Sequence, residues 1–291
     1  MDGPSGPENP ESPESPENPE SPEKPEGPDG PGSPEDAEGG AAVSAVEFGV
    51  KGPRGWAFRG VDIDAAPGSL VAVEGPSGSG RTSLLLALTG RMRSADGTAT
   101  VAGHRLPKQM AAVRRVSALA HVPGVTDLDP ALTVAEHIRE RALLQRRFDG
   151  SLRGLLRSPA ARKAEARQRT DAALAAAGLD LDALPKGPRT AVRDLERVEA
   201  LRLSLGLALV GRPRLIAVDD TDLKLADAEQ DEIWAQLRAV AAAGTTVVAV
   251  CSQAPDTADV VVSTAPERPA AVPTTPTDKE TADALAEAGR A

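Results

Sequence analysis

Cysteine is almost absent from this chain, since Cys251 is its single copy among 291 residues. One thiol cannot form an internal disulfide, and such a chain fits a reducing compartment. Long apolar runs are also missing, because no stretch approaches the roughly 18 residues that a membrane-spanning helix needs. The N-terminus lacks the apolar segment of a signal peptide. These absences predict a cytoplasmic protein that reaches the inner face of a membrane only through a partner.

Aromatic residues are scarce at 2% of the chain, and tyrosine does not occur. Phe148 is the one aromatic residue in a strongly basic stretch, residues 139–169. Without aromatic platforms for base stacking, we expect no nucleic-acid partner. Two interpretations of this stretch stay open: solvated faces of surface helices, or a docking face for a partner or an anionic surface. Its ten bases are Arg139, Arg141, Arg146, Arg147, Arg153, Arg157, Arg162, Lys163, Arg167 and Arg169, against three acids, Glu140, Asp149 and Glu165.

Acidic residues gather at the N-terminus. Residues 1–40 contain twelve acids and one lysine, a net charge of −11 against −10 for the whole chain, so the remainder is close to neutral. Proline recurs at every third position from Pro4 to Pro34, which is the period of a polyproline II helix. The segment has too few apolar residues for a core, and it is either a solvated spacer or an acidic arm that docks on a basic surface.

The composition divides the chain into three parts. We expect disordered tails over residues 1–42 and 265–291, and one α/β domain over 43–264. Apolar runs separated by helical patterns predict a mixed sheet, with antiparallel strands on the N-terminal side, a mostly parallel core and a helical insert at about 125–205. The expected strands are 43–48, 56–64, 70–73, 98–102, 116–122, 214–220, 245–251 and 259–262. The expected helices are 81–91, those within 133–176, 194–210 and 227–243.

One stretch carries a recognisable motif. The apolar run Leu70–Val73 predicts a strand, a glycine-rich turn follows, and a helix begins near Arg81. This is the phosphate-binding pattern G-x-x-x-x-G-K-[ST] with arginine in place of lysine. The glycines let backbone N–H groups approach a phosphate, and the helix N-terminus adds its dipole. The candidate binding residues are Gly75, Ser77, Gly78, Ser79, Gly80, Arg81, Thr82 and Ser83.

This motif, followed by Leu215–Asp219, resembles the ATP-binding cassette ATPases, the motor subunits of ABC transporters. The resemblance covers about residues 43–264 and includes Leu132–Val134, Ala208–Pro213 and Gly244–Val248. It implies a P-loop NTPase-like fold, ATP and Mg²⁺ as cofactors, and an integral membrane partner or a second ABC subunit. It also implies that Thr82 and Asp219 hold the magnesium ion.

Several positions depart from the family pattern. Asp220 stands where the family has its catalytic glutamate, and it is one methylene shorter, which displaces the base by about 1 Å. Ser252 stands at the switch histidine and cannot carry its charge. Gly124 replaces a glutamine and has no side chain to reach a metal or water. Arg81 either binds phosphate or points to solvent.

The largest departure is Leu195–Glu199, in place of Leu-Ser-Gly-Gly-Gln. In the family this segment contacts the γ-phosphate held by the opposing subunit. Here Glu196 would bring a negative charge towards that phosphate, which predicts that the chain cannot complete a partner's site. The family's adenine-stacking aromatic is also missing near Lys51. Trp56 is the nearest substitute, although we expect Trp56 and Phe58 to pack in the core.

Three functions therefore stay open. The first is a degenerate ATP-binding subunit that hydrolyses ATP slowly or not at all. The second is a non-enzymatic scaffold or regulatory protein on the same fold. The third is an ATPase that is active only in a heterodimer with an intact partner. A small-molecule kinase is disfavoured, because Leu132–Val134 and Gly211–Pro213 would then match by coincidence.

Overall fold

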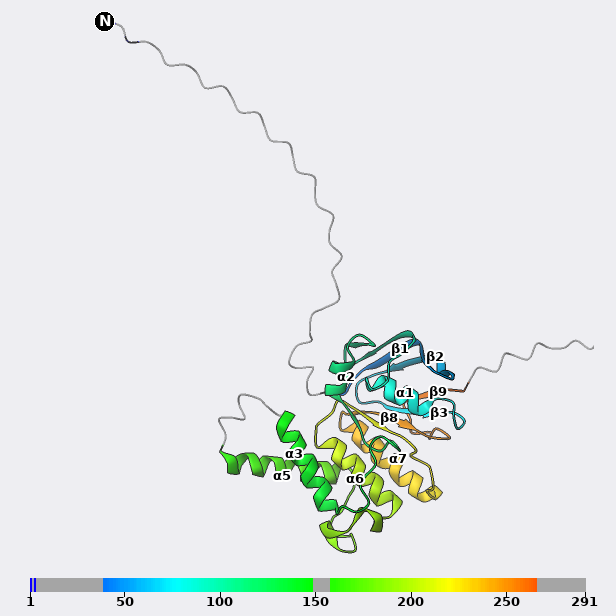
Figure 1. Cartoon of the computed structure of the whole chain (residues 1–291), viewed down its shortest axis with the longest axis vertical. Helices are drawn as coiled ribbons and strands as arrows, with labels where there is room; N and C mark the ends of the chain where they lie inside the picture. Colours follow the sequence, from blue (N-terminus) through cyan, green and yellow to red (C-terminus); the bar gives the residue numbers. More distant parts are fainter. Residues whose placement is uncertain (2, 4–38, 149–157, 266–291) are drawn as a thin grey trace, which may run out of the picture.

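The computed structural model describes residues 1, 3, 39–148 and 158–265. The predicted tails lie almost entirely outside the described residues, as do Arg153 and Arg157. The described part contains two sheets, with helices grouped mainly on one side of the second sheet (Figure 1).

The first sheet is antiparallel and confirms the prediction for the N-terminal side. Its strands are β1 (Val43–Gly52), β2 (Gly55–Ala65), β4 (Asp96–Val101) and β5 (His104–Leu106), in the order β2-β1-β4-β5. A short turn at Pro53 and Arg54 joins β1 to β2, which pair along most of their length. Polar and apolar residues alternate in β2, as expected of a sheet with one buried face.

The second sheet is parallel and forms the centre of the domain. Its strands are β3 (Leu70–Glu74), β6 (Ser117–Leu119), β7 (Leu215–Val218), β8 (Thr246–Val250) and β9 (Val260–Ser263), in the order β6-β7-β8-β3-β9. The central strands β3, β7 and β8 are uncharged apart from Glu74 at the end of β3, and they are buried on both faces. Uninterrupted apolar strands are typical of a parallel sheet that is covered twice.

The two faces of this sheet belong to different hydrophobic clusters. Val71 and Val73 of β3 pack with α1 (Arg81–Leu88) and the antiparallel sheet. Leu70 and Ala72 pack instead with α6 (Arg197–Leu209) and α7 (Asp227–Ala242). Figure 1 shows this layering, with the antiparallel sheet on one side of the parallel strands and α6 and α7 on the other.

The predicted helical insert contains α3 (Val134–Phe148) and α5 (Pro159–Ala176), which lie beside α6. A capping box begins α3: the Glu136 carboxylate accepts from the Thr133 amide at 2.8 Å, and the Glu136 amide donates to the Thr133 hydroxyl at 3.3 Å. Two single-turn 3₁₀ helices, η2 (Gly187–Arg189) and η3 (Val192–Asp194), lead into α6. A separate small core holds this region together, formed by Val134, Leu174, Leu179, Leu184 and Leu203.

Several predicted boundaries were wrong. The strand expected over 116–122 is confined to β6 (Ser117–Leu119), and a helix that was not expected, α2 (Met110–Val116), precedes it. Helix α1 ends at Leu88 and not at residue 91, and α6 begins at Arg197. Among the described residues, no helix combines the length and apolar character needed to cross a membrane.

Candidate phosphate-binding site

The predicted site residues come together at one edge of the parallel sheet. Strands β3, β7 and β8 are neighbours and run in the same direction, so the residues that follow them meet at their carboxyl ends. The loop 75–80 follows β3, Asp219 and Asp220 follow β7, and Cys251 and Ser252 follow β8. The topology thus joins three predicted segments that lie far apart in the sequence.

The loop depends on its glycines. Gly75, Gly78 and Gly80 all have positive φ, at 149°, 82° and 89°. A Cβ atom on Gly80 would lie 2.1 Å from the Ala57 carbonyl oxygen of β2, whereas one on Gly78 would meet nothing within 4 Å. Gly80 therefore packs the loop against the neighbouring sheet, and Gly78 keeps the exposed side of the loop open.

Helix α1 begins directly at this loop, with Gly80 as its N-cap. Its first turn contains no acidic residue. The amides of the first turn have no acceptor within the helix, and together with the helix dipole they favour an anion. This is the geometry that a phosphate group needs.

Thr82 and Asp219 are in direct contact. The Thr82 hydroxyl donates to the Asp219 carboxylate at 2.6 Å, and the Asp220 amide donates to the other carboxylate oxygen at 2.9 Å. Asp219 is only 2% exposed, and its burial raises the pKa of the carboxyl, although the Thr82 hydrogen bond opposes this. A hydroxyl and a buried carboxylate in contact are suitable oxygen ligands for Mg²⁺ or for its water shell.

Arg81 does not point freely into solvent. Its guanidinium donates to the Cys251 carbonyl at the end of β8 and is only partly exposed. The side chain therefore extends from the start of α1 to the carboxyl end of β8. Here it is held at the site by one hydrogen bond and retains further N–H donors for a phosphate.

The three serines of the motif differ in their surroundings. The Ser79 hydroxyl is 2.6 Å from that of Thr264, just after β9, so this side chain fastens the loop to the sheet. The Ser79 amide donates to the Pro76 carbonyl at 3.1 Å within the turn. Ser77 is exposed on the loop, and Ser83 is partly buried in α1. Ser79 is thus a loop brace in this structure, a role that the motif alone did not indicate.

The two predicted catalytic residues lie on adjacent loops. Asp220 has φ of 50°, an unfavourable conformation for a residue with a side chain, and such conformations cluster at functional sites. The Ser252 amide donates to the Asp222 carboxylate at 2.5 Å, which ties the loop after β8 to the loop after β7. Asp222 therefore links these two loops at this edge of the sheet.

The loop after β6 approaches the same region. Gly124 is exposed, with φ of 75°, and its amide donates to the Asp127 carboxylate at 2.9 Å.

The His121 carbonyl accepts from the Asp219 amide at 2.7 Å. His121 Nε2 lies 3.2 Å from Arg197 Nη2 at the start of α6. Burial lowers the pKa of His121, and the charge of Arg197 lowers it further, although Asp220 and Asp127 oppose this. Because a guanidinium can only donate, Nε2 is the acceptor in this contact.

The segment 195–199 forms the N-terminus of α6. Glu196 is its exposed N-cap, and the Glu199 carboxylate folds back to accept from the Glu196 amide at 2.8 Å. Arg197 is directed towards His121 of the same chain. Two carboxylates therefore occupy this helix N-terminus, and the amide of Glu196 already has an acceptor.

Trp56 is not in the core, so that expectation was wrong, whereas Phe58 is buried at 4% exposure as expected. The Trp56 side chain is 42% exposed at the start of β2. Lys51 Nζ lies 5.7 Å and Arg59 Cζ 5.2 Å from its ring. Both cations lie within cation–π distance of the exposed indole, and Trp56 immediately precedes Ala57, against which the P-loop packs.

This fold and this edge define a nucleotide-binding domain of the P-loop class. The model of the family described as "ABC transporter" matches residues 58–222, more than half of the chain. The chain belongs to the ABC transporter family and is a nucleotide-binding domain of that family.

Known relatives resemble part of the chain. The Nod factor export ATP-binding protein I of Cupriavidus metallidurans is 29% identical over 189 residues, which cover 65% of this chain and 55% of that protein. The Fe(3+) ions import ATP-binding protein FbpC of Streptomyces avermitilis is 31% identical over 191 residues, which cover 65% of this chain and 49% of that protein. The chain thus spans about half the length of these relatives.

Solved structures share the fold. The ATP-binding cassette MJ0796, in a dimeric post-hydrolysis state bound to ADP and Pi, has a TM-score of 0.59 at 20% identity, covering 78% of this chain and 97% of that one. The subunit cbiO1 from Clostridium perfringens, part of the complex cbiONQ, has a TM-score of 0.59 at 17% identity, covering 74% and 79%. These likenesses support the two-sheet architecture described above.

Proposed function

We propose that this chain binds MgATP as a subunit of an ABC-type assembly and that it hydrolyses ATP slowly or not at all on its own. The glycine loop, the amides at the N-terminus of α1 and Arg81 would hold the phosphates. Thr82 and Asp219 would hold Mg²⁺, which when bound neutralises phosphate charge. The contact between the Thr82 hydroxyl and the Asp219 carboxylate supports this, because it places two oxygen ligands together beside the loop.

The proposal of impaired hydrolysis rests on the N-terminus of α6. A segment that completes a partner's site must present free amides to a γ-phosphate. Here the amide of Glu196 is bound by the carboxylate of Glu199, and Glu196 adds a second negative charge. Desolvated like charges repel by several kcal/mol, so a triphosphate cannot approach this helix as it would approach serine and glycine.

The residues around the attacking water support the same proposal. Asp220 and Ser252 are the candidate catalytic residues, but the shorter carboxylate of Asp220 and the uncharged Ser252 would each position or polarise water less well. Gly124 is exposed and contributes no side chain. Trp56 is a candidate platform for adenine, because it is exposed beside the strand segment on which the loop packs.

We further propose that the subunit pairs with a membrane-spanning partner or a second ABC subunit at the inner face of a membrane. The family membership supports this, since no described helix is long and apolar enough to span a membrane itself.

A stepwise restoration tests the proposal. The variant Glu196→Ser/Arg197→Gly/Val198→Gly/Glu199→Gln rebuilds the family segment, and adding Asp220→Glu rebuilds the base. We expect wild type to bind MgATP with negligible phosphate release, and the five-residue variant to gain at least about tenfold in turnover. Circular dichroism checks that α6 is retained, and Thr82→Ala in the same background should remove the gain.

The other hypotheses give different results. Absence of binding at millimolar MgATP would favour a scaffold function. Turnover that appears in the wild-type chain only after mixing with a co-purifying ABC subunit would favour the heterodimer. Rapid turnover by the wild-type chain alone would contradict impaired hydrolysis.

A further inference from the structure

A second concave site lies at the opposite edge of the parallel sheet. It is a cavity of about 620 Å³ between α5, the end of α6 and the turn from α7 to β8. Arg214 and Thr245, which line it, directly precede β7 and β8. These are the amino ends of the strands, whereas the phosphate loop lies at their carboxyl ends. The cavity is therefore separate from the nucleotide site.

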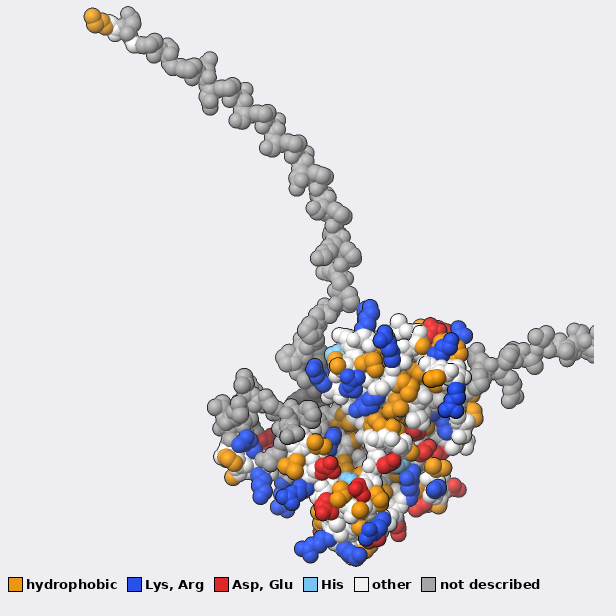
Figure 2. Space-filling view, in the orientation of Figure 1, with side chains coloured by type: hydrophobic (Ala, Val, Ile, Leu, Met, Phe, Trp, Pro, Cys, Tyr) orange, Lys and Arg blue, Asp and Glu red, His pale blue; other side chains and the backbone are white. Residues whose placement is uncertain are grey.

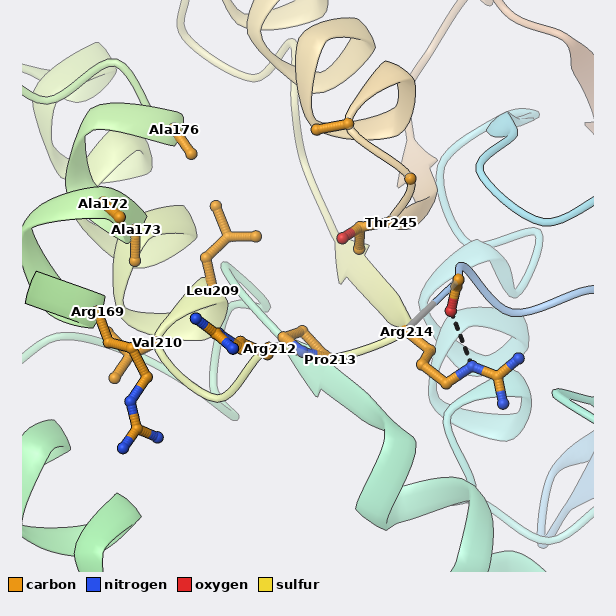
Figure 3. Close-up of a pocket in the computed structure, with 13 residues that line it drawn as sticks. Arg169, Ala172, Ala173, Ala176, Leu209, Val210, Arg212, Pro213, Arg214 and Thr245 are labelled. Atoms are coloured by element: carbon orange, nitrogen blue, oxygen red, sulfur yellow. Dashed lines mark hydrogen bonds between the residues drawn. The ribbon is translucent and has the colours of Figure 1, made fainter. Parts of the chain in front are cut away.

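The lining of this cavity is cationic. Three arginines contribute to it, Arg169, Arg212 and Arg214, and none of the described residues that line it is acidic. Figure 3 shows Arg169 beside Ala172 and Ala173, Arg212 next to it, and Arg214 on the far side, where its hydrogen bond to Gly39 is drawn. Arginines with no opposing carboxylate in the lining favour an anionic occupant.

The arginines differ in how far they are already engaged. Arg214 Nε and Nη2 donate to the carbonyls of Gly39 and Gly40, at 2.9 and 3.1 Å. Arg169 Nη2 lies 4.0 Å from the Glu165 carboxylate on α5. Arg212 is exposed, with φ of 48°, and has no ion pair with any carboxylate in the described part of the chain.

The chain enters the domain at this cavity. Gly39 is itself one of the lining residues. A Cβ atom on Gly40 would lie 2.4 Å from the Gly68 amide and 2.5 Å from the Gly244 carbonyl, so the chain is tightly enclosed there. The Ala41 amide donates to the Arg214 carbonyl at 3.0 Å, and its carbonyl accepts from Thr246 at 2.7 Å. Residues 39–41 are thus anchored, and whatever precedes them starts at the rim of the cavity.

We propose that this cavity is the docking site for the acidic segment immediately before it, Glu35-Asp36-Ala37-Glu38. An extended chain spans at most about 3.5 Å per residue, so the tether from Gly39 to any of these three acids is no longer than about 14 Å of backbone. The short tether gives them a high effective concentration at the arginines. The small apolar Ala37 between the acids is compatible with the alanine side of the cavity.

The earlier acids of the N-terminal segment contribute less in this arrangement. Glu8, Glu11 and Glu14 are more than twenty residues further from the anchor. Their longer tethers lower the effective concentration of these acids at the cavity, and Debye screening weakens their attraction to it. The proposal therefore assigns the docking to position in the sequence and not to the total charge of the segment.

Hydrogen exchange of the full chain tests this with a matched pair of variants. The triple variant Glu35→Gln/Asp36→Asn/Glu38→Gln removes three negative charges beside the anchor. The control Glu8→Gln/Glu11→Gln/Glu14→Gln removes three distant ones. At about 20 mM salt we expect the first variant to exchange about two- to fivefold faster than wild type in residues 209–214 and 243–245, and the control to match wild type. At about 0.5 M salt the difference should disappear.

A substitution on the cavity side completes the test. Arg212→Glu should produce the same acceleration in residues 243–245 as the triple variant. Arg54→Glu, in the exposed turn between β1 and β2, changes the charge equally and should produce none. Unchanged exchange in the triple variant, or equal acceleration in both acidic variants, would overturn the proposal.

Two further results would also overturn it. If 10 mM inorganic phosphate protected these residues equally in wild type and in the triple variant, the cavity would be a site for small anions. If the difference depended on protein concentration, the occupant would be another copy. MgATP affinity should be the same in all four variants, so a general failure of nucleotide binding would count against the proposed function and not against this docking.

Discussion

The N-termini of α1 and α6 differ in their charge, because acidic residues are absent from the first and present at the second. Helix α1 begins at Gly80, has no acid in its first turn and faces an open glycine loop. Helix α6 begins at Glu196, has Glu199 in its first turn, and that carboxylate bonds to the Glu196 amide. Both helices offer unsatisfied amides and a positive dipole end, but only α1 leaves them available to an external anion.

This contrast separates the two tasks of the domain. The phosphate-binding half depends on a loop, a helix dipole and the contact of Thr82 with Asp219, all of which are in place. The N-terminus of α6, which would face a partner's nucleotide, makes its polar contacts within its own chain. The Glu199 carboxylate accepts from the Glu196 amide, and Arg197 contacts His121. Under the proposed function, the domain keeps the nucleotide-binding role of its fold and loses the role at a partner's site. Figure 2 shows no comparable segregation at large scale, since acidic and basic side chains are mixed over the face in view.

The largest expected effect comes from the loop. Gly80→Ala places a Cβ atom 2.1 Å from the Ala57 carbonyl oxygen, so the loop must move away from β2. We expect a loss of about 3 kcal/mol or more in the free energy of unfolding, together with loss of nucleotide binding. Gly78→Ala is the control, because its Cβ meets nothing within 4 Å and its positive φ should cost about 1 kcal/mol. Equal destabilisation of the two variants in urea would contradict the packing role of Gly80.

The next effect concerns Arg81. Replacing it with alanine removes a charged donor beside the loop, and we expect MgATP affinity to fall about 10- to 100-fold in a calorimetric titration. Arg81→Lys keeps the charge and should retain most of the affinity. Arg212→Ala, at the opposite edge of the sheet, should leave the affinity unchanged. Unaltered affinity in Arg81→Ala would show that this side chain does not bind phosphate.

A smaller and more specific effect is expected at Asp219. Burial raises the pKa of this carboxyl above its unfolded value, so its contribution to stability is complete below the unfolded pKa and is lost as the pH rises through the folded pKa. Asp219→Asn removes the buried charge and should leave the unfolding free energy unchanged or raise it by up to about 1 kcal/mol. Nucleotide affinity should then no longer respond to Mg²⁺. A response equal to that of wild type would exclude Asp219 from metal binding.

The α6 side should respond in stability only. Glu199→Ala removes the acceptor of the Glu196 amide, and we expect a loss of about 0.5–1 kcal/mol in the free energy of unfolding. MgATP affinity should stay at the wild-type value, because this helix does not contribute to the chain's own phosphate site. Asp231→Ala, which removes an exposed acid from α7, serves as a control for the general change in charge. A change in MgATP affinity in Glu199→Ala would contradict the view that the N-terminus of α6 and the phosphate site at α1 act independently.

The smallest expected effect is a pH dependence at His121. Burial and Arg197 lower the pKa of this imidazole in the folded state. The unfolded chain then takes up protons first, so stability is complete above the unfolded pKa of about 6.5 and falls as the pH drops below it. His121→Gln should flatten the pH dependence of urea unfolding in this range. If the pH dependence of urea unfolding were the same in His121→Gln and wild type, groups other than His121 would be responsible for it.

Much of the fold could be predicted because its strands have a simple signature. The uncharged runs around Ala72, Ile216 and Val248 could only be strands that are buried on both faces. No element was expected over residues 110–115, where α2 lies, because its 7 residues are too few to show a helical period. The expectation that Trp56 is buried was wrong, because the sequence does not show that this indole lies at the surface with Lys51 and Arg59 beside its ring.

The site was predicted as a set of residues but not as a set of contacts. Motif spacing identified the loop, Thr82 and Asp219, since these lie on strands and a helix with clear patterns. The contact of Ser79 with Thr264 joins residues 185 positions apart, and that of His121 with Arg197 joins residues 76 apart. Neither pair belongs to a motif, so only the topology of the sheet could reveal them.

The most direct test measures MgATP binding and phosphate release on the same preparation of the wild-type chain. Saturable binding at up to millimolar MgATP, lost in Thr82→Ala and accompanied by negligible phosphate release, is the predicted result. Phosphate release at the rate of a working ABC ATPase, about 1 per second or faster, would contradict the proposal that the N-terminus of α6 cannot complete a partner's site. Absence of binding would contradict an intact phosphate site.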